Sequence, residues 1–441
     1  MYMFQSIKTF VTQMPRHLMV ASSAWISKII VSIIQIISIR TLLSYLGEER
    51  YAVYTIAFSL TLWFNLVSFG LGFSLQNFIS EARAKKESYE KYIIAALQIT
   101  VLLLIVAFLA VLLISSPVQE IIFRKFTFIQ EIEHINIVFF IGIISATTAI
   151  LGIIYKVYYA LHKGYIPNIM PAVAAVISMT LIVLFNHYSH VQHSILSALL
   201  IFTLPQLFLV LTAFITSFKK YFTKSFSFNF EVIKLLFTRA LKFYGINILG
   251  LAYMQTDYLV ISQTLNTNEI VKYNIFSRVF MVFTFIYITM MQAIWPVNAE
   301  MFVRKEFTKI KTIIKKCVCA SAILIVLGTI TVIFFANLII KVLAPGLNIA
   351  PSLSLILLLG LYTFLLAWQD TFATLLQSMN VLKIFWIYLP PMLVINILSQ
   401  HFMSKKYGSD GIVLGLIISM ISLSSWVLPT KIYSIIKKRK L

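Results

Sequence analysis

Long apolar segments alternate with short polar segments along the whole chain. A helix needs about 20 apolar residues to cross the hydrocarbon core of a bilayer, which is ~30 Å thick. None of the segments shows the period-2 alternation of a transmembrane strand, and each is too long to be one. The pattern predicts an all-α polytopic membrane protein with about 12 transmembrane helices, at 18–40, 51–76, 92–116, 135–157, 166–187, 194–218, 240–264, 271–295, 318–342, 351–378, 384–402 and 411–436.

The composition excludes a soluble domain. The 441 residues have a mean hydropathy of +0.92, and 12% of them are charged, whereas soluble domains carry about 25%. The net charge of +21 does not indicate nucleic-acid binding, because that function needs a basic face on a soluble domain. Here the basic residues form short clusters between apolar segments, so these clusters are expected to bind anionic membrane lipids.

The distribution of Lys and Arg predicts the orientation of the chain. With the N-terminus in the cytoplasm, 26 of the 36 basic residues belong to cytoplasmic segments and 8 to outer segments. Lys28 and Arg278 are counted inside spans. Cytoplasmic loops of membrane proteins are enriched in Lys and Arg. Both termini are therefore expected to be cytoplasmic.

A charged sequence occurs twice, 219 residues apart. "ISEARAKKE" (79–87) is echoed by "NAEMFVRKE" (298–306). The echo predicts two pseudo-symmetric six-helix bundles, 1–218 and 219–441. An even number of spans per repeat keeps the orientation of each copy, so the bundles should be related by an axis along the membrane normal. Such bundles enclose a central cleft, and rocking one against the other gives alternating access.

The two copies of the echo also predict local ion pairs. Glu81 and Glu300 each precede a basic residue at i+4, Lys85 and Arg304. This order favours ion pairs on a helix, which indicates that both helices continue past the membrane surface.

Lys28 is the deepest basic residue that the spans contain. It lies ten residues into the first span, near the middle of the bilayer at 1.5 Å per residue. A charge there costs about 2.5–3.5 kcal/mol on insertion scales. We expect Lys28 to face the cleft, and the alternative is a lysine that snorkels or pairs with a buried acid.

Four further ionisable residues are candidates for the site. Arg278 and Asp257 lie in the outer parts of adjacent spans, where they could form an ion pair that tethers these helices. Alternatively, Arg278 binds an anion in the cleft and Asp257 orients it or titrates. Asp370 lies near the inner interface, where a solvated helix end is expected, and Arg40 ends the first span as a possible interfacial anchor. Lys28, Arg278 and Arg40 are thus the candidate substrate-binding cations, and Asp257 and Asp370 the candidate coupling or orienting acids.

The sequence offers no catalytic or metal-binding motif. Cys317 and Cys319 form a lone C-x-C pair without accompanying histidines, whereas a structural zinc site needs four ligands. A P-loop and a G-x-S-x-G motif are both missing from the sequence. We therefore expect neither an enzyme nor a bound metal or cofactor, although coupling to protons or sodium ions remains open.

Several segments resemble the polysaccharide transporter branch of the multidrug/oligosaccharidyl-lipid/polysaccharide exporter superfamily, most closely the O-antigen (Wzx-type) flippases. They are "RTLLSYLGEERYAVYTI", "SFGLGFSLQNFISEARAKKE", "QTDYLVISQTL", "VKYNIFSRVF" and "AIWPVNAEMFVRKEF". The resemblance implies translocation of undecaprenyl-diphosphate-linked oligosaccharide across the bacterial inner membrane. Related lipid flippases hold the diphosphate with cations in the first, second and eighth helices. Lys28 and Arg278 match the first and eighth, and the second span has no internal cation.

Two other functions are weighed against this one. A multidrug or cation antiporter of the same superfamily should have buried carboxylates in its N-terminal half, and spans 1 to 6 have none in their interiors. A polytopic polysaccharide polymerase or glycosyltransferase usually needs a larger outer loop than this chain has. The resemblance also makes a polysaccharide polymerase and a chain-length regulator candidate partners.

Overall fold

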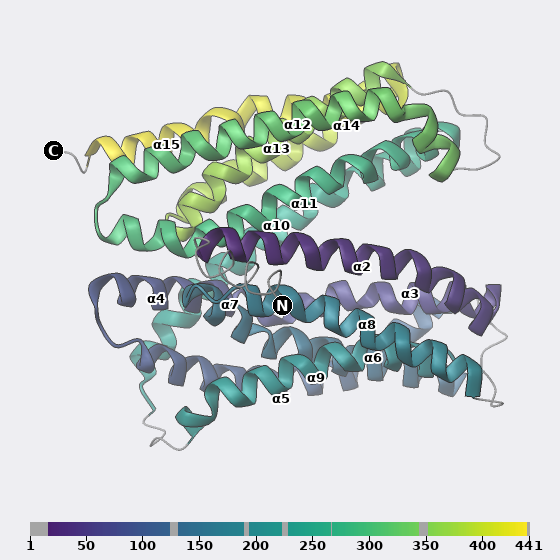
Figure 1. The fold of residues 1–441 in the computed structure, drawn as a ribbon, viewed down its shortest axis with the longest axis horizontal. Coiled ribbons are helices and arrows are strands. Elements are labelled where there is room, and N and C mark those ends of the chain that lie inside the picture. The colour runs from purple at the N-terminus through teal and green to yellow at the C-terminus, as the bar shows by residue number, and fades with distance from the viewer. Residues whose placement is uncertain are drawn as a thin grey trace, which may run out of the picture. The chain divides into compact units, whose positions relative to one another are not determined.

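The computed structural model describes residues 16–123, 131–188, 194–222, 228–265, 267–343 and 352–438. Almost all of these residues are helical (Figure 1), which confirms the predicted all-α class. The first unit of the chain contains α2 (Arg16–Leu46), α3 (Glu48–Phe64), the 3-10 helix η1 (Asn65–Ser68), α4 (Leu71–Lys85), α5 (Glu90–Phe123), α6 (Glu131–Leu151), α7 (Ile153–Ala160), α8 (Tyr165–Tyr188) and α9 (Ile195–Phe222). There follow α10 (Phe230–Thr264), α11 (Thr267–Val303), α12 (Phe307–Leu343), α13 (Leu353–Ser378), α14 (Lys383–Ser419), the π-helix η2 (Met420–Ser424) and α15 (Ser425–Lys438).

Nine helical segments of the described residues are long and apolar enough to cross a membrane, or ten if the bent pair α3–α4 counts as one span. Eight of them correspond one to one to predicted spans 3 to 10. The predicted first span appears as a shorter apolar helix, Met19–Gln35 within α2. The predicted segments 384–402 and 411–436 belong to one helical run, Lys383–Lys437. The count is lower than the predicted twelve because the first predicted span is a shorter helix, the second is a bent pair, and the last two form one helical run.

The long C-terminal run contains a break at Gly408. Its φ of 58° and ψ of −133° lie outside helical geometry, so two helices meet there within α14. The positive φ suits glycine, which has no Cβ to clash with the backbone. The carboxylate of Glu269 in α11 secures the break by accepting hydrogen bonds from the backbone N–H of Ser409 (3.0 Å) and from its hydroxyl. Lys272 in turn forms an ion pair with Glu269 at 2.7 Å.

The chain divides into two compact units, Met1–Tyr244 and Gly245–Leu441, and the division falls inside α10. Polar contacts explain why the first part of α10 belongs to the first unit. The hydroxyl of Ser74 donates to the carbonyl oxygen of Leu236 at 2.9 Å. The guanidinium of Arg239 forms an ion pair with Glu81 at 2.9 Å and lies 3.6 Å from the ring centre of Phe78.

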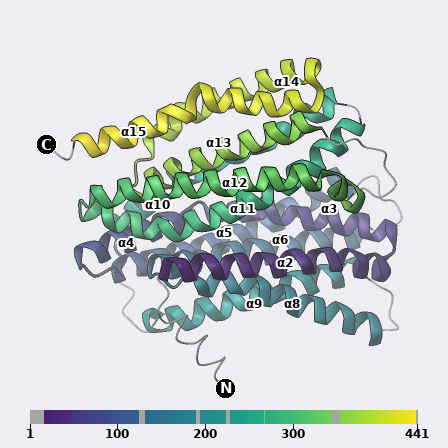
Figure 2. The same cartoon turned by 45° about the horizontal axis from the view of Figure 1, so that its top comes forward.

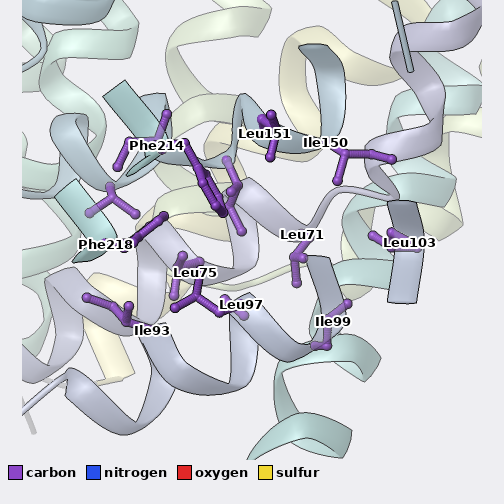
Figure 3. Packing of buried hydrophobic residues seen from close by; sticks show 14 of the residues in the cluster. Leu71, Leu75, Ile93, Leu97, Ile99, Leu103, Ile150, Leu151, Phe214 and Phe218 are labelled. Atoms are coloured by element: carbon purple, nitrogen blue, oxygen red, sulfur yellow. The ribbon is translucent and has the colours of Figure 1, made fainter. Parts of the chain in front are cut away.

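Apolar packing in the first unit holds α4, α5, α6, α7 and α9 together. Figure 3 shows Leu71 and Leu75 of α4 among side chains of α5, α6 and α9, including Leu97, Ile150 and Phe214. In the second unit, α13 packs against both α11 and α12 (Figure 2). Many large apolar side chains on the same helices stay exposed, such as those of α5 and α12. Exposed apolar helix surfaces of this extent are expected where the neighbouring solvent is lipid.

Both copies of the charged echo end a helix in the same way. Lys86 and Lys305 have positive φ values of 60° and 61°, and each follows the last turn of its helix, as in a Schellman motif. His162 and Asn380 repeat this conformation after α7 and α13, with φ values of 57° and 60°. A hydrogen bond between residues five apart closes each end: Glu87 to Ala82, Glu306 to Met301, Lys163 to Tyr158 and Val381 to Leu376.

The ion pairs of the two copies differ. Glu300 pairs with Arg304 as predicted, at 3.6 Å. Glu81 instead pairs with Arg239 from α10, and the predicted partner Lys85 is four residues along its own helix. The contact from α10 prevails because Arg239 can bind Glu81 and cover the ring of Phe78 at the same time.

This difference predicts unequal contributions to stability. Arg239→Ala should lower the free energy of unfolding by about 1–3 kcal/mol, because it removes a contact of 2.9 Å whose arginine side chain is only 15% exposed. Arg304→Ala removes a contact of 3.6 Å whose arginine side chain is 51% exposed, and should cost about 0.5 kcal/mol or less. The thermal unfolding midpoints of the two purified variants in detergent check this expectation. Equal midpoints for both would contradict it.

Candidate functional site

The second predicted span is broken at residues 69 and 70. The segments Val53–Ser68 and Leu71–Lys85 are bent by 44° relative to each other. Phe69 and Gly70 both have positive φ values, 47° and 70°, between η1 and α4. A Cβ on Gly70 would lie 2.7 Å from the carbonyl oxygen of Ala240. Glycine is therefore required here both by its backbone conformation and by the close approach of α10.

A cavity of about 370 Å³ opens at this break, entirely within the first unit. Its wall consists of residues from η1, α4, α5, α6, α7 and α9. Most of the lining is apolar or glycine, and none of the described lining residues is Asp or Glu. Its polar side chains are Ser68, Thr148, Tyr155, Lys156 and Gln206.

Lys156 of α7 supplies the positive charge of this cavity. Its ammonium lies over the ring of Phe73, 3.9 Å from the ring centre, and 5.7 Å from that of Tyr159. A Cβ on Gly72 would lie only 2.7 Å from Cγ of Lys156, so a glycine at this position makes room for the lysine stem. Beside the lysine, the amide of Gln206 donates a hydrogen bond to the Tyr155 hydroxyl at 2.9 Å.

The sequence did not predict this role for Lys156. The residue lies close to the end of the fourth predicted span, where basic residues usually mark the cytoplasmic side. The double glycine of "SFGLGF" was the available signal, because it marks a close approach of two helices. Which side chain fills the space beside Gly72 depends on a contact between α4 and α7, and these lie far apart in the sequence.

The predicted cations lie elsewhere. Lys28 is exposed on α2, on a face where Ile26 and Ile29 are each 60% exposed. The opposite face of α2 packs on α8, where the Asn168 amide donates to the carbonyl oxygen of Val20 at 2.7 Å. Arg278 is exposed on α11. Arg40 belongs to α2, and its side chain lies outside the described residues.

The two candidate acids of the second unit have different surroundings. The carboxylate of Asp257 accepts a hydrogen bond from the Tyr273 hydroxyl at 2.8 Å, and the described residues contain no ion pair between Asp257 and Arg278. Asp370 is eight residues from the end of α13, deeper than the predicted solvated helix end. Tyr287 of α11 and Tyr388 of α14 lie close enough to interact with its charge. Within the described part of the chain, no side chain hydrogen bonds to Asp370.

A buried polar network also lies in the second unit. Asn396 of α14 accepts hydrogen bonds from Gln400 and from Ser419, and the Ser419 hydroxyl lies 3.0 Å from that of Tyr253. This network adjoins the π-helix η2, and π-helical turns often occur at functional positions. A second cavity of about 440 Å³ between α12 and α13 has an almost wholly apolar wall, which makes it unsuited to a charged ligand.

Comparisons with known proteins place the whole chain among exporters. The family model described as polysaccharide biosynthesis protein matches residues 20–302. An O-antigen transporter of Salmonella typhi is 34% identical over 98% of this chain and 99% of its own. An O-antigen export protein of Yersinia pseudotuberculosis is 32% identical over 95% of this chain and 96% of its own. These relatives are named as transporters or export proteins, in agreement with the expected absence of an enzymatic activity.

Solved structures show the same fold. The MATE transporter VcmN of Vibrio cholerae has a TM-score of 0.76 at 14% identity, covering 96% of this chain and 97% of its own. A MOP superfamily transporter of Pyrococcus furiosus has a TM-score of 0.71 at 15% identity, with 96% of both chains covered. At these identities the likeness concerns the fold alone.

The contact between Gly72 and Lys156 yields a double-mutant prediction. Gly72→Ala should destabilise the protein by about 1–3 kcal/mol, because its methyl group overlaps the lysine stem. Combining it with Lys156→Ala removes Cγ and should recover most of that loss. Unfolding in detergent of the two single variants and the double variant gives the coupling energy.

Gly250→Ala is the matched control, because a Cβ there would meet no atom within 4 Å. It should leave the unfolding midpoint unchanged or slightly higher, since alanine favours a helix. Strictly additive effects of Gly72→Ala and Lys156→Ala would show that the two residues are not in contact.

Proposed function

Because the chain belongs to the polysaccharide biosynthesis protein family, we propose that it is a flippase for undecaprenyl-diphosphate-linked oligosaccharide. The cargo is an O-antigen or related surface polysaccharide repeat unit, moved from the cytoplasmic to the outer leaflet of the bacterial inner membrane. The observation that carries this proposal is the similarity, over nearly the full length of both chains, to proteins named as O-antigen transporters.

The charge of the chain suits such a cargo. Lys28 and Arg278 are exposed cations within apolar helices, and Arg40 is the third cation of the proposed set. A diphosphate is an anion, and cations within spans are expensive unless they serve a function. An inside-negative membrane potential favours export of an anion by about 2.3 kcal/mol per charge and 100 mV.

The proposed mechanism is alternating access. Twelve helices in two six-helix bundles with cytoplasmic termini would enclose a cleft that opens to one leaflet and then to the other. The likeness to transporters of known fold supports this arrangement. On this proposal Lys28, Arg278 and Arg40 hold the diphosphate in the cleft. A polysaccharide polymerase and a chain-length regulator would act on the exported cargo and are proposed as partners.

A multidrug or cation antiporter is the second candidate, because solved structures of that kind share the fold. Those structures are only 15% identical to the chain, whereas the O-antigen transporters reach 34%. An antiporter for cations should also hold a carboxylate inside its N-terminal spans, where this sequence has none.

Complementation of flippase-deficient cells tests the proposed function. The wild-type chain should restore surface polysaccharide and clear the lipid-linked repeat units that accumulate on the cytoplasmic side. The double variant Lys28→Ala/Arg278→Ala should insert into the membrane normally but reduce surface polysaccharide at least tenfold, because the diphosphate loses its counter-charges. Extracted lipid-linked oligosaccharide and surface polysaccharide are quantified in parallel.

Lys431→Ala serves as the control, since Lys431 is an exposed lysine of α15 outside the proposed set. It should leave surface polysaccharide within twofold of wild type. Normal surface polysaccharide in the double variant would overturn the role of these cations, and accumulated precursor despite a well-expressed wild-type chain would overturn the flippase.

We further propose that export is coupled to proton or sodium movement through an acid of the second unit. Asp370 is the stronger candidate, because it lies inside a span and receives no hydrogen bond from the described residues. Asp257 is already held by Tyr273, which suits an orienting role. A carboxylate without fixed partners can bind a cation and release it again.

Transport assays in liposomes test this coupling. An imposed proton or sodium gradient should accelerate export by the wild-type protein several-fold, and Asp370→Asn should remove the acceleration by whichever ion is used. Asp257→Asn should keep it, because an amide oxygen still accepts from Tyr273. Equal acceleration in Asp370→Asn and wild type would exclude Asp370 as the coupling site.

A further inference from the structure

The cavity at the break of the second span has the features of an anion site. We propose that it binds a phosphate group, with the Lys156 ammonium as its cation and the first backbone amides of α4 as further donors. This inference rests on the proposed function and deepens it, because it adds a phosphate subsite inside the first unit to the cations of the cleft.

The charge balance of the cavity is the first argument. The ammonium of Lys156 contacts two aromatic ring faces, and the described residues of the lining include no Asp or Glu that could neutralise it. Among the described residues, no carboxylate forms an ion pair with Lys156. Ring faces attract a cation less strongly than a carboxylate does. A charge that lines a mostly apolar cavity with this little compensation is expected to serve a bound anion.

The backbone at the break is the second argument. Helix α4 begins at Leu71, and the first hydrogen bonds to the Gly70 carbonyl come from Phe73 and Ser74. The amides of Leu71 and Gly72 precede these bonds, as do the first amides of any helix, and both residues line the cavity. A helix N-terminus combines such amides with the positive end of the helix dipole, and broken membrane helices use it to bind anions.

The space available is the third argument. A water molecule occupies about 30 Å³ in the liquid, so a cavity of about 370 Å³ accommodates a phosphate group and part of what is attached to it. Tyr155 of α7 and Gln206 of α9, which are joined by a hydrogen bond, supply further polar atoms to the lining. A lysine and a helix N-terminus together are a common arrangement for phosphate.

The position of Lys156 also adds a charge to the second predicted span. That span has no cation of its own. The structure places the ammonium of Lys156, from α7, over the ring of Phe73 in α4. The charge is thus located at the second span although its residue belongs to another helix.

Binding of soluble prenyl diphosphates to the purified full-length chain tests this proposal. The probes are farnesyl diphosphate, inorganic pyrophosphate and uncharged farnesol, measured by titration calorimetry in detergent. Lys156→Ala should weaken farnesyl diphosphate binding at least tenfold, and Lys156→Arg should retain binding within about threefold. Lys163→Ala, an exposed lysine seven residues away, should stay within twofold of wild type. Farnesol should bind all four proteins equally.

The outcomes distinguish the source of the phosphate. Competition by pyrophosphate indicates that a free phosphate anion fills the site, and binding of farnesyl diphosphate alone indicates a lipid-linked headgroup. Unchanged farnesyl diphosphate affinity in Lys156→Ala, or an equal loss for farnesol, would overturn the proposal.

A purely structural role is tested in the same samples. Removing a poorly compensated charge should leave the unfolding midpoint of Lys156→Ala unchanged or higher. A lower midpoint with binding intact would show that Lys156 only tethers α7 to α4, which contradicts the proposal. If Lys156→Ala binds normally while the wild-type chain complements flippase-deficient cells, only the phosphate site fails. If the wild-type chain does not complement them, the proposed function itself fails.

Discussion

The structure depends on one constraint, which is that hydrocarbon offers neither hydrogen bonds nor counter-charges. Nearly every described residue within the spans is helical, because a helix satisfies its backbone internally. Where the backbone leaves this geometry, the chain itself supplies the compensation. At Gly408 it is the carboxylate of Glu269, and beside Gly70 it is close packing against α10. Beside the break at Gly70, the contacts that the described residues make with the Lys156 ammonium are to aromatic rings and not to a carboxylate. This difference makes the cavity the place where a ligand is expected.

The two units end corresponding helices in the same conformation, but they differ in their interiors. Schellman-type helix ends recur at Lys86 and Lys305 and again at His162 and Asn380, as expected for a duplicated unit. Inside, the first unit has a cationic cavity and the second a network of Tyr253, Asn396, Gln400 and Ser419 together with the acid Asp370. The phosphate subsite at Lys156 and the coupling acid Asp370 are therefore proposed for different units, while Arg278 gives the second unit a contact to the cargo as well.

Much of the fold could be predicted from the sequence, because the thickness of the hydrocarbon core sets a minimum length for every transmembrane helix. The apolar segments predicted the helical class, and the motifs predicted the family, which the comparisons confirm. The predicted gap between residues 402 and 411 contains the break at Gly408. The break at Gly70 lay inside the predicted second span, since hydropathy averages over a whole turn of helix. The partner of Glu81 was also missed, because the local rule favours Lys85 and the contact with Arg239 spans 158 residues. The role of Lys156 was not predicted for the same reason. Its neighbour Phe73 is set by packing between helices and not by the spacing of residues along one.

The most direct test of the central claim is a translocation assay with purified protein in liposomes. Fluorescent undecaprenyl-diphosphate-linked oligosaccharide is placed in one leaflet, and the fraction that a membrane-impermeant quencher reaches from outside is followed with time. The account predicts that the wild-type chain moves this lipid between leaflets many times faster than protein-free liposomes, and that it does not accelerate an uncharged prenol. Equal rates with and without the protein, in liposomes where correct insertion is verified, would contradict it.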